Sequence, residues 1–280
     1  MKNNIFIFGD SYADPSYKFE EYDTWHFLLT RYFADYDVKN FGRNSTGPHY
    51  SFKKLYDLLF KEKQIKENDV IIFVLSGNDR ITFYGLDPYI SSDIKWRLDP
   101  DIQNDEKLYC HDLCNSDVRK YFDENKEKIK FSCKTFEEEI RYLNAKNEAF
   151  LYYISRVKKC KIFLMFKGNP FEFYDSNLND KNFYKLKESL FEISHFEVSK
   201  NEEEYYNNSS VTYSTRTDKR SNHLSKENHF VLFDLIKKFI ENDNIDYKWN
   251  TNFKKLDDCF FPDDINDQKI DQLKGDFIYE

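Results

Sequence analysis

The chain has 280 residues, of which 40% are apolar and 33% charged, and this length allows one large domain with a full hydrophobic core. Its net charge of −8 argues against a nucleic-acid backbone or an anionic membrane surface as the main partner. No window reaches transmembrane length, and the first predicted strand begins too early for a signal peptide to precede it. We therefore expect a cytoplasmic protein, or part of a virion made in the cytoplasm.

The cysteine content predicts reduced thiols rather than a disulfide framework. The five cysteines are an odd number without framework spacing: Cys110, Cys114, Cys133, Cys160 and Cys259. His111 lies between two of them, but no second ligand pair at zinc spacing accompanies it, so we predict no metal and no cofactor. The abundance of Lys, Asn, Phe, Tyr and Ile is typical of an AT-rich genome, such as that of a low-GC bacterium or its phage.

The segment Ile5–Asp14 is the first informative stretch. Four apolar residues run into Gly9-Asp10-Ser11, which predicts a buried strand that ends at a turn. Ser11 then lies at the carboxyl end of the strand, where open α/β sheets bind ligands. Two interpretations of Ser11 are open at this point: a nucleophile, or a turn or N-cap serine.

The following segments predict a layered α/β domain. A helix is expected over 25–33 with Asp23 or Thr24 as its N-cap, followed by a short strand over 37–41, a helix over 52–59 and a strand over 70–75. The last of these is continuously apolar, as expected of a parallel strand covered on both faces. Alternation of strands and helices is typical of a parallel sheet with helices packed on it.

The second half of the chain is less regular. Residues 81–135 are expected to form a long insertion at the carboxyl edge of the sheet. Beyond it we predict a helix over 136–151, a strand over 162–166, a polar segment over 171–221 with short strands near 191–198 and 211–213, and a helix over 225–240. We assign 1–245 to the domain and 246–280 to an extension whose aromatic residues pack on the domain or a partner.

Three predicted strands end in small or polar residues, and parallel strands bring such ends to one edge of a sheet. The ends are Gly9-Asp10-Ser11, the loop over 40–47, and Ser76-Gly77-Asn78-Asp79. A nucleophile would also need a base. Among the histidines, His223 is best placed, since it lies on a loop just before the last helix, whereas His26 and His229 lie inside predicted helices with the structural role that most histidines have.

These segments resemble the four sequence blocks of the GDSL/SGNH hydrolase family, over residues 4–80 and about 215–240. The resemblance implies an α/β, flavodoxin-like three-layer α/β/α sandwich with a central parallel sheet, and acyl hydrolysis through a serine. It implies that Ser11 is the nucleophile and an oxyanion donor. Ser45 (with Gly47 two residues on) and Asn78 would be the other oxyanion donors, and His223 the general base.

The chain departs from the family pattern at its last block. The family carries an aspartate three residues before the histidine, where this chain has Arg220. Asp218 is the nearest carboxylate and would complete a triad if the loop bulges; otherwise the site is a Ser11–His223 dyad. The second block is also altered, since Ser45 stands where the family has a glycine. The third block matches the family well, although Ser76 takes the place of the family's glycine two residues before Asn78.

The sequence therefore predicts a serine esterase acting on an acyl ester, with a carbohydrate O-acetyl group as the suggested substrate. Two alternatives stay open. The first is a catalytically weakened binding or structural module, for example a component of a phage particle or of surface-polysaccharide machinery. The second is an O-acyltransferase that uses the same residues. The expected partner is a small-molecule or carbohydrate ester, with no nucleic acid and no membrane, and the sequence leaves the oligomeric state open.

Overall fold

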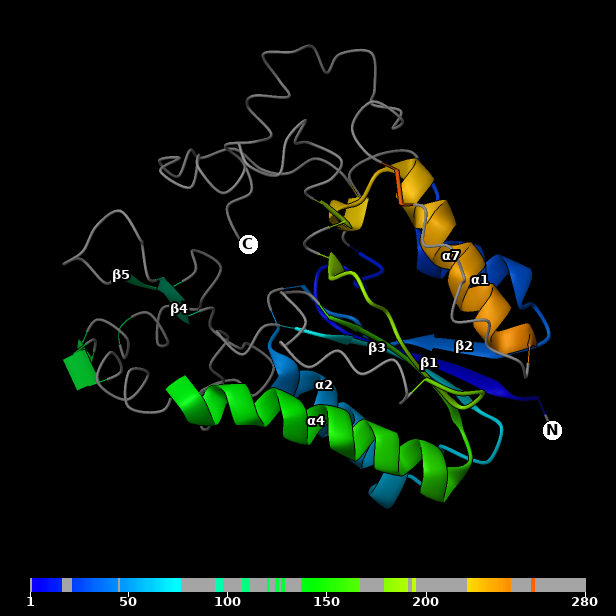
Figure 1. The fold of residues 1–280 in the computed structure, drawn as a ribbon, viewed down its shortest axis with the longest axis horizontal. Coiled ribbons are helices and arrows are strands. Elements are labelled where there is room, and N and C mark those ends of the chain that lie inside the picture. Colours follow the sequence, from blue (N-terminus) through cyan, green and yellow to red (C-terminus); the bar gives the residue numbers. More distant parts are fainter. Residues whose placement is uncertain are drawn as a thin grey trace, which may run out of the picture.

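Figure 1 shows the fold of the protein in a computed structural model. The structure describes residues 2–16, 22–44, 46–76, 94–97, 107–110, 120, 124–125, 127–128, 137–166, 179–190, 193–194, 221–242 and 253–254.

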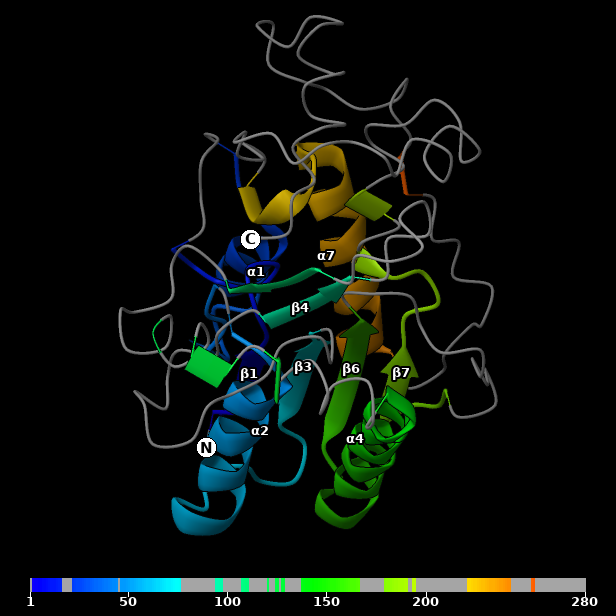
Figure 2. The same ribbon diagram turned by 90° about the vertical axis from the view of Figure 1, so that its left-hand side faces the viewer.

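The domain is built on a five-stranded, fully parallel sheet with the order β2-β1-β3-β6-β7. Figure 2 shows β3, β6 and β7 side by side. Their bounds are β1 (Asn4–Phe8), β2 (Asp37–Asn40), β3 (Val70–Leu75), β6 (Lys161–Phe166) and β7 (Phe183–Lys185). Numbered by their succession along the chain, these strands run 2-1-3-4-5 across the sheet, one of the two common orders of doubly wound α/β folds.

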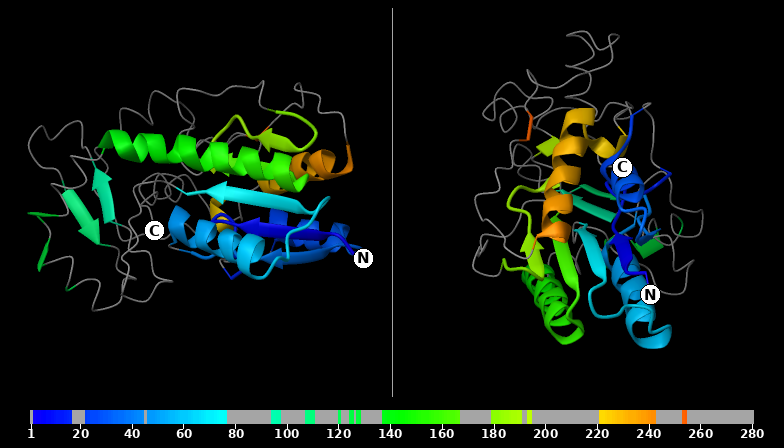
Figure 3. Two further views of the ribbon diagram at one scale, coloured as in Figure 1. Left: turned by 90° about the horizontal axis from the view of Figure 1, so that it is seen from below. Right: turned by 90° about the vertical axis from the view of Figure 1, so that its right-hand side faces the viewer.

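Helices cover both faces of the sheet (Figures 1 and 3). One face carries α1 (Trp25–Tyr32) and α7 (Lys226–Glu241). The other carries α4 (Glu137–Lys158) and α2 (Pro48–Tyr56), which continues into a π-helical turn over Asp57–Lys61. The expected α/β architecture with a parallel sheet is confirmed at this level.

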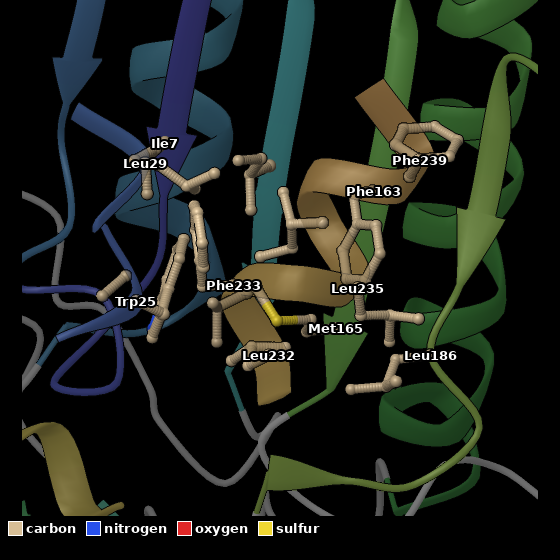
Figure 4. Close-up of a cluster of buried hydrophobic side chains, with 14 of the residues drawn as sticks. Ile7, Trp25, Leu29, Phe163, Met165, Leu186, Leu232, Phe233, Leu235 and Phe239 are labelled. Carbon is tan, nitrogen blue, oxygen red and sulfur yellow. The ribbon is translucent and has the colours of Figure 1, made fainter. Parts of the chain in front are cut away.

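The two hydrophobic layers follow from the alternation of side chains along each strand. On β1, Ile7 faces the α1/α7 layer, whereas Phe6 and Phe8 face the α2/α4 layer. Figure 4 shows the first layer, in which Phe163 from β6 packs against Phe239 of α7 with ring centroids 5.6 Å apart. Since both faces are covered, all six residues of β3 are buried, which explains why its sequence is continuously apolar.

The predicted elements match the observed ones where hydrophobic patterning is strong. The strands near 37–41, 70–75 and 162–166 and the helices of both layers are present close to their expected bounds, except that α4 continues to Lys158 instead of ending near 151. The strand expected near 191–198 is wrong for the two residues described there, Ile193 and Ser194, which are helical. The strand near 211–213 lies outside the described residues. Strand β7 was not predicted, because it is three residues long and includes a lysine.

For two further predicted segments, the insertion and the carboxyl-terminal extension, the structure describes only some of the residues. Within the predicted insertion, β4 (Ile94–Arg97) and β5 (Lys107–Cys110) pair antiparallel as a separate two-stranded sheet (Figure 3). Within the extension, Phe253 packs against the α1/α7 layer, and the backbone of Lys254 exchanges two hydrogen bonds with the Asn228 side chain. Packing of the extension is therefore observed for these residues, and the rest of the extension lies outside the described residues.

Of the cysteine side chains, that of Cys160 is described, and it is a free, buried thiol, as expected. Burial raises the pKa of the Cys160 thiol to about 12, so the thiol stays protonated and unreactive at neutral pH. Among the helices in the described part of the chain, none combines the length and the apolar character that crossing a membrane would require.

A lysine at the start of β6 caps the carboxyl end of α7. Lys161 Nζ donates to the carbonyls of Ile240 at 2.8 Å and of Phe239 and Asn242 at 3.3 Å each. The last carbonyls of a helix lack partners inside the helix and carry the negative end of its dipole, so a cation is favourable here.

Lys161→Met keeps the aliphatic stem but removes this cap, and we expect it to lower the free energy of unfolding by about 1–2 kcal/mol in urea titrations. The control is Lys159→Met, which removes an exposed lysine whose Nζ lies 3.5 Å from a Glu67 oxygen. That substitution is expected to cost less than about 0.5 kcal/mol. Equal losses in the two variants would contradict the capping role.

Candidate functional site

Ser11 lies in a turn just beyond the carboxyl end of β1. The Ala13 N–H closes the turn by donating to the Asp10 carbonyl over 2.9 Å, and the Tyr12 N–H donates to Asp10 Oδ1 over 3.2 Å. In the described residues after this turn, the first helix begins only at Trp25, so the N-cap interpretation of Ser11 is wrong, whereas its place in a turn is confirmed. In a sheet of this strand order, ligands bind beyond the carboxyl ends of β1 and β3, where the strand order reverses.

The Ser11 hydroxyl is paired with the imidazole of His223. Ser11 Oγ lies 2.9 Å from His223 Nε2, although the two residues are 212 positions apart in the chain. Ser11 is buried and His223 half-buried. The ring of Tyr12 packs against the imidazole with a centroid separation of 4.9 Å. A hydroxyl hydrogen-bonded to an imidazole nitrogen is the arrangement that allows the imidazole to accept the hydroxyl proton.

His223 belongs to a short 3-10 turn, Ser221–His223, directly before α7. Both Asn222 (φ 50°) and His223 (φ 62°) adopt left-handed backbone conformations, which are costly for residues other than glycine and persist only when their surroundings hold them. Tyr22 supplies one such restraint: its hydroxyl accepts from the Ser221 N–H over 3.1 Å and donates to the Leu224 carbonyl over 2.6 Å. This phenol therefore spans the histidine turn from one end to the other.

Two more side chains hold the histidine turn. Ser194 Oγ donates to the His223 carbonyl over 2.9 Å. His229 Nε2 lies 2.7 Å from the Ser221 carbonyl, and the Trp25 N–H points to His229 Nδ1 over 3.3 Å. Since the carbonyl only accepts and the backbone N–H only donates, His229 is neutral with its proton on Nε2. Its role is structural, as expected from its place in a helix.

The loop after β2 is joined to the Ser11 turn by the Asn40 side chain. Asn40 Nδ2 donates to the Ala13 carbonyl over 2.9 Å, and Asn40 Oδ1 accepts from the Gly42 N–H over 2.8 Å. The backbones of Gly42 and Ala13 are in direct contact, since a Cβ on Gly42 would lie 2.5 Å from the Ala13 carbonyl carbon and oxygen. Glycine is required here because of this close approach.

A buried carboxylate ties the same two loops together further along. Asp14 Oδ1 accepts from the Ser16 N–H and hydroxyl over 2.7 and 2.6 Å, and Asp14 Oδ2 accepts from the Asn44 N–H over 2.5 Å. The loop that the resemblance assigns to the oxyanion hole is therefore fixed against the turn that carries Ser11.

Gly42→Ala is expected to force these loops apart and to lower the free energy of unfolding by about 1–3 kcal/mol, because the atoms that the new methyl group meets are backbone atoms. Chemical denaturation measures the loss. The second substitution Ala13→Gly removes only the Ala13 methyl group, so the Gly42→Ala/Ala13→Gly double variant is expected to stay destabilised. A Gly42→Ala variant as stable as the wild type would contradict the close approach.

The remaining predicted site residues are placed only in part. Gly47 is the N-cap residue of α2. Ser45, Asn78, Asp218 and Arg220 lie outside the described residues.

Ser76, two residues before Asn78, directly follows β3 and is buried. The last pair between β1 and β3 is Phe8 with Phe73, so Ser11 and Ser76 both follow beyond this pair in their segments. Among the described residues, the Ser76 hydroxyl has no hydrogen-bond partner. The third block therefore begins at the same edge of the sheet as the first.

The side chains that surround the Ser11–His223 pair were not identified from the sequence. Tyr22 and Ser194 contact the histidine turn from segments with no motif of their own, so no local signal could have found them. His26 and Asn222 contact each other across 196 positions of the chain. Asn222 directly precedes the candidate base, and that proximity was the one available indication.

Within the described residues, no group of three or more histidine, cysteine or carboxylate side chains is arranged to hold a metal ion. A scan against protein-family models found no match for the chain, and a search of curated proteins found none either. The resemblance to the SGNH hydrolases therefore rests on the short motifs themselves.

Proposed function

We propose that this chain is a serine-dependent acyl hydrolase of the SGNH type, with Ser11 as nucleophile and His223 as general base. The observation that carries the proposal is the 2.9 Å contact between Ser11 Oγ and His223 Nε2 at the carboxyl edge of the sheet. The 2-1-3-4-5 strand order supports the flavodoxin-like sandwich that the resemblance implies.

The proposed reaction has two acyl-transfer steps. His223 Nε2 takes the Ser11 hydroxyl proton while Oγ attacks the ester carbonyl, and the resulting oxyanion is stabilised by N–H donors of the Ser11 turn and the loop after β2. Collapse of this intermediate breaks the ester C–O bond, and the alcohol leaves with the proton from His223. Water then attacks the acyl-serine with His223 again as base, releasing the acid and restoring Ser11.

The acid that orients His223 is part of the same proposal. Asp218 would accept a hydrogen bond from His223 Nδ1 and complete a triad. Asn78 would add a side-chain donor to the oxyanion hole. Tyr22 and Ser194 hold the backbone of the histidine turn through hydrogen bonds. These bonds support a site in which the position of the His223 backbone helps to orient the imidazole.

The test combines a fluorophosphonate probe, which labels activated serines, with hydrolysis of p-nitrophenyl acetate. We expect labelling and turnover by the wild type and neither by Ser11→Ala. The matched control is Ser155→Ala: Ser155 is also buried, but it lies in α4 and donates to the Tyr152 carbonyl within that helix. It is expected to behave as the wild type. Absence of Ser11-dependent labelling and turnover would contradict the proposal and favour a non-catalytic binding module.

A second measurement identifies the substrate class. O-acetylated sugars and longer acyl esters should be compared as substrates, with acetylated carbohydrate proposed as the preferred class. Acyl transfer to an added sugar, at the expense of free acetate, would identify the protein as an O-acyltransferase that uses the same Ser11 and His223.

A further inference from the structure

Asn222 joins the two halves of the Ser11–His223 pair through its own side chain. Asn222 Nδ2 donates to the carbonyl of Ser11 and, over 3.0 Å, to the carbonyl of Asp14. On its other side, Asn222 Oδ1 lies 3.2 Å from His26 Nε2 in α1. Asn222 and His26 are both buried, so these bonds are protected from water.

The direction of each hydrogen bond can be assigned from the partners. The carbonyls of Ser11 and Asp14 only accept, so the Asn222 amide nitrogen must face them and its oxygen must face His26. His26 Nε2 therefore carries a proton. The Thr24 hydroxyl oxygen lies beside the same ring, 3.0 Å from Nε2 and 3.3 Å from Nδ1, so Thr24 and Asn222 together hold the imidazole of His26 in place.

This side chain controls two backbones at once. Its amide nitrogen donates to the carbonyl of Ser11, the proposed nucleophile. Asn222 itself directly precedes His223, the proposed base, in the chain. Because the amide bonds across the gap between the Ser11 turn and the histidine turn, it limits how far Ser11 and His223 can separate. His26 fixes the amide from α1, a third element of the fold.

We propose that Asn222, oriented by His26, is a positioning residue that sets the separation of Ser11 Oγ and His223 Nε2. This proposal rests on the proposed acyl-hydrolase function for its kinetic consequence but not for its structural one. The competing explanation is that an asparagine stands here only because it tolerates the left-handed backbone at φ 50°.

The variant Asn222→Gly separates these explanations, because glycine adopts the left-handed conformation without strain but has no side chain. We expect Asn222→Gly to fold, to lower kcat for p-nitrophenyl acetate by about 10²-fold and to change KM by less than about twofold. His26→Leu, which cannot donate to Asn222 Oδ1, is expected to show the same pattern. His26→Gln puts an amide nitrogen near the place of Nε2 and is expected to retain most of kcat.

A second measurement does not depend on turnover. The ring nitrogens of His223 can be followed by NMR in protein labelled with ¹⁵N-histidine. In the otherwise wild-type chain, Ser11→Ala is expected to shift the Nε2 resonance, because the hydrogen bond to Oγ is lost. In the Asn222→Gly background, Ser11→Ala is expected to leave the resonance unchanged, because the hydrogen bond is already broken.

The outcomes distinguish the two proposals. If the wild type lacks Ser11-dependent turnover, the proposed function fails, and the NMR comparison alone decides whether Asn222 positions the pair. An equal Ser11→Ala shift in both backgrounds overturns the positioning role. Wild-type kcat in Asn222→Gly also overturns it and leaves the backbone explanation.

Discussion

His223→Ala is expected to lower kcat/KM for p-nitrophenyl acetate by about 10³-fold or more while leaving the circular dichroism spectrum of the protein unchanged. In the proposed mechanism, the imidazole accepts the Ser11 proton as the carbonyl is attacked, and loss of the general base removes about 10²–10⁴ of the rate on its own. The fold should survive, since His223 is half-buried and its backbone carbonyl, rather than its ring, accepts from Ser194.

Chemical rescue gives this prediction a specific control. The alanine variant leaves a space the size of the ring beside Ser11, so added imidazole is expected to restore part of the rate in His223→Ala and none in Ser11→Ala. A His223→Ala variant with wild-type kinetics would remove His223 from the mechanism. If activity is lost and imidazole does not restore it, circular dichroism of the same sample shows whether the variant has unfolded.

The parts of the site that could be predicted from the sequence are those that short motifs place at strand and helix ends. Ser11 follows a strand with no polar residue among its last four, and His223 precedes a helix whose N-cap, Ser225, accepts from the Asn228 N–H over 3.2 Å. In a parallel sheet the strand ends meet at one edge, so the order of the motifs along the chain is enough to bring the residues together.

The supporting contacts could not be predicted, because they depend on residues that have no local pattern. Tyr22 reaches Ser221 across 199 positions, and His26 reaches Asn222 across 196. Each contact exists only after α1 and the histidine turn have both been placed by the core. A histidine or tyrosine inside an apolar pattern gives no indication of which distant carbonyl or amide it will meet.

The edge strand β7 was missed for a related reason. Its three residues, Phe183, Tyr184 and Lys185, are all buried, and a lysine in such a position breaks the apolar pattern by which a strand is recognised. The lysine is accommodated by an ion pair that the sequence does not reveal.

Lys185→Met is expected to be the most destabilising of the substitutions considered for the fold, with a loss of about 3 kcal/mol in the free energy of unfolding. Lys185 Nζ lies 2.8 Å from both carboxylate oxygens of Glu148 in α4, and the side chains are 1% and 13% exposed. The Phe166 ring, 5.0 Å from Nζ, further limits access of water. Removal of the ammonium group leaves the Glu148 carboxylate in a largely dry site, and urea titration measures that cost.

The decisive control is the double variant Lys185→Met/Glu148→Met. Replacing both charges of a buried pair by apolar groups of similar size is often neutral, because the desolvation cost of the charges disappears together with their attraction. We therefore expect the double variant to regain most of the stability lost in Lys185→Met, with a coupling energy of more than about 1 kcal/mol between the two positions. Additive losses would mean that Lys185 stabilises the edge strand through the packing of its stem rather than through its charge. In that case the apolar contacts between α4 and β7 would matter more than this ion pair, among them that of the Tyr152 and Phe183 rings, whose centroids are 5.3 Å apart.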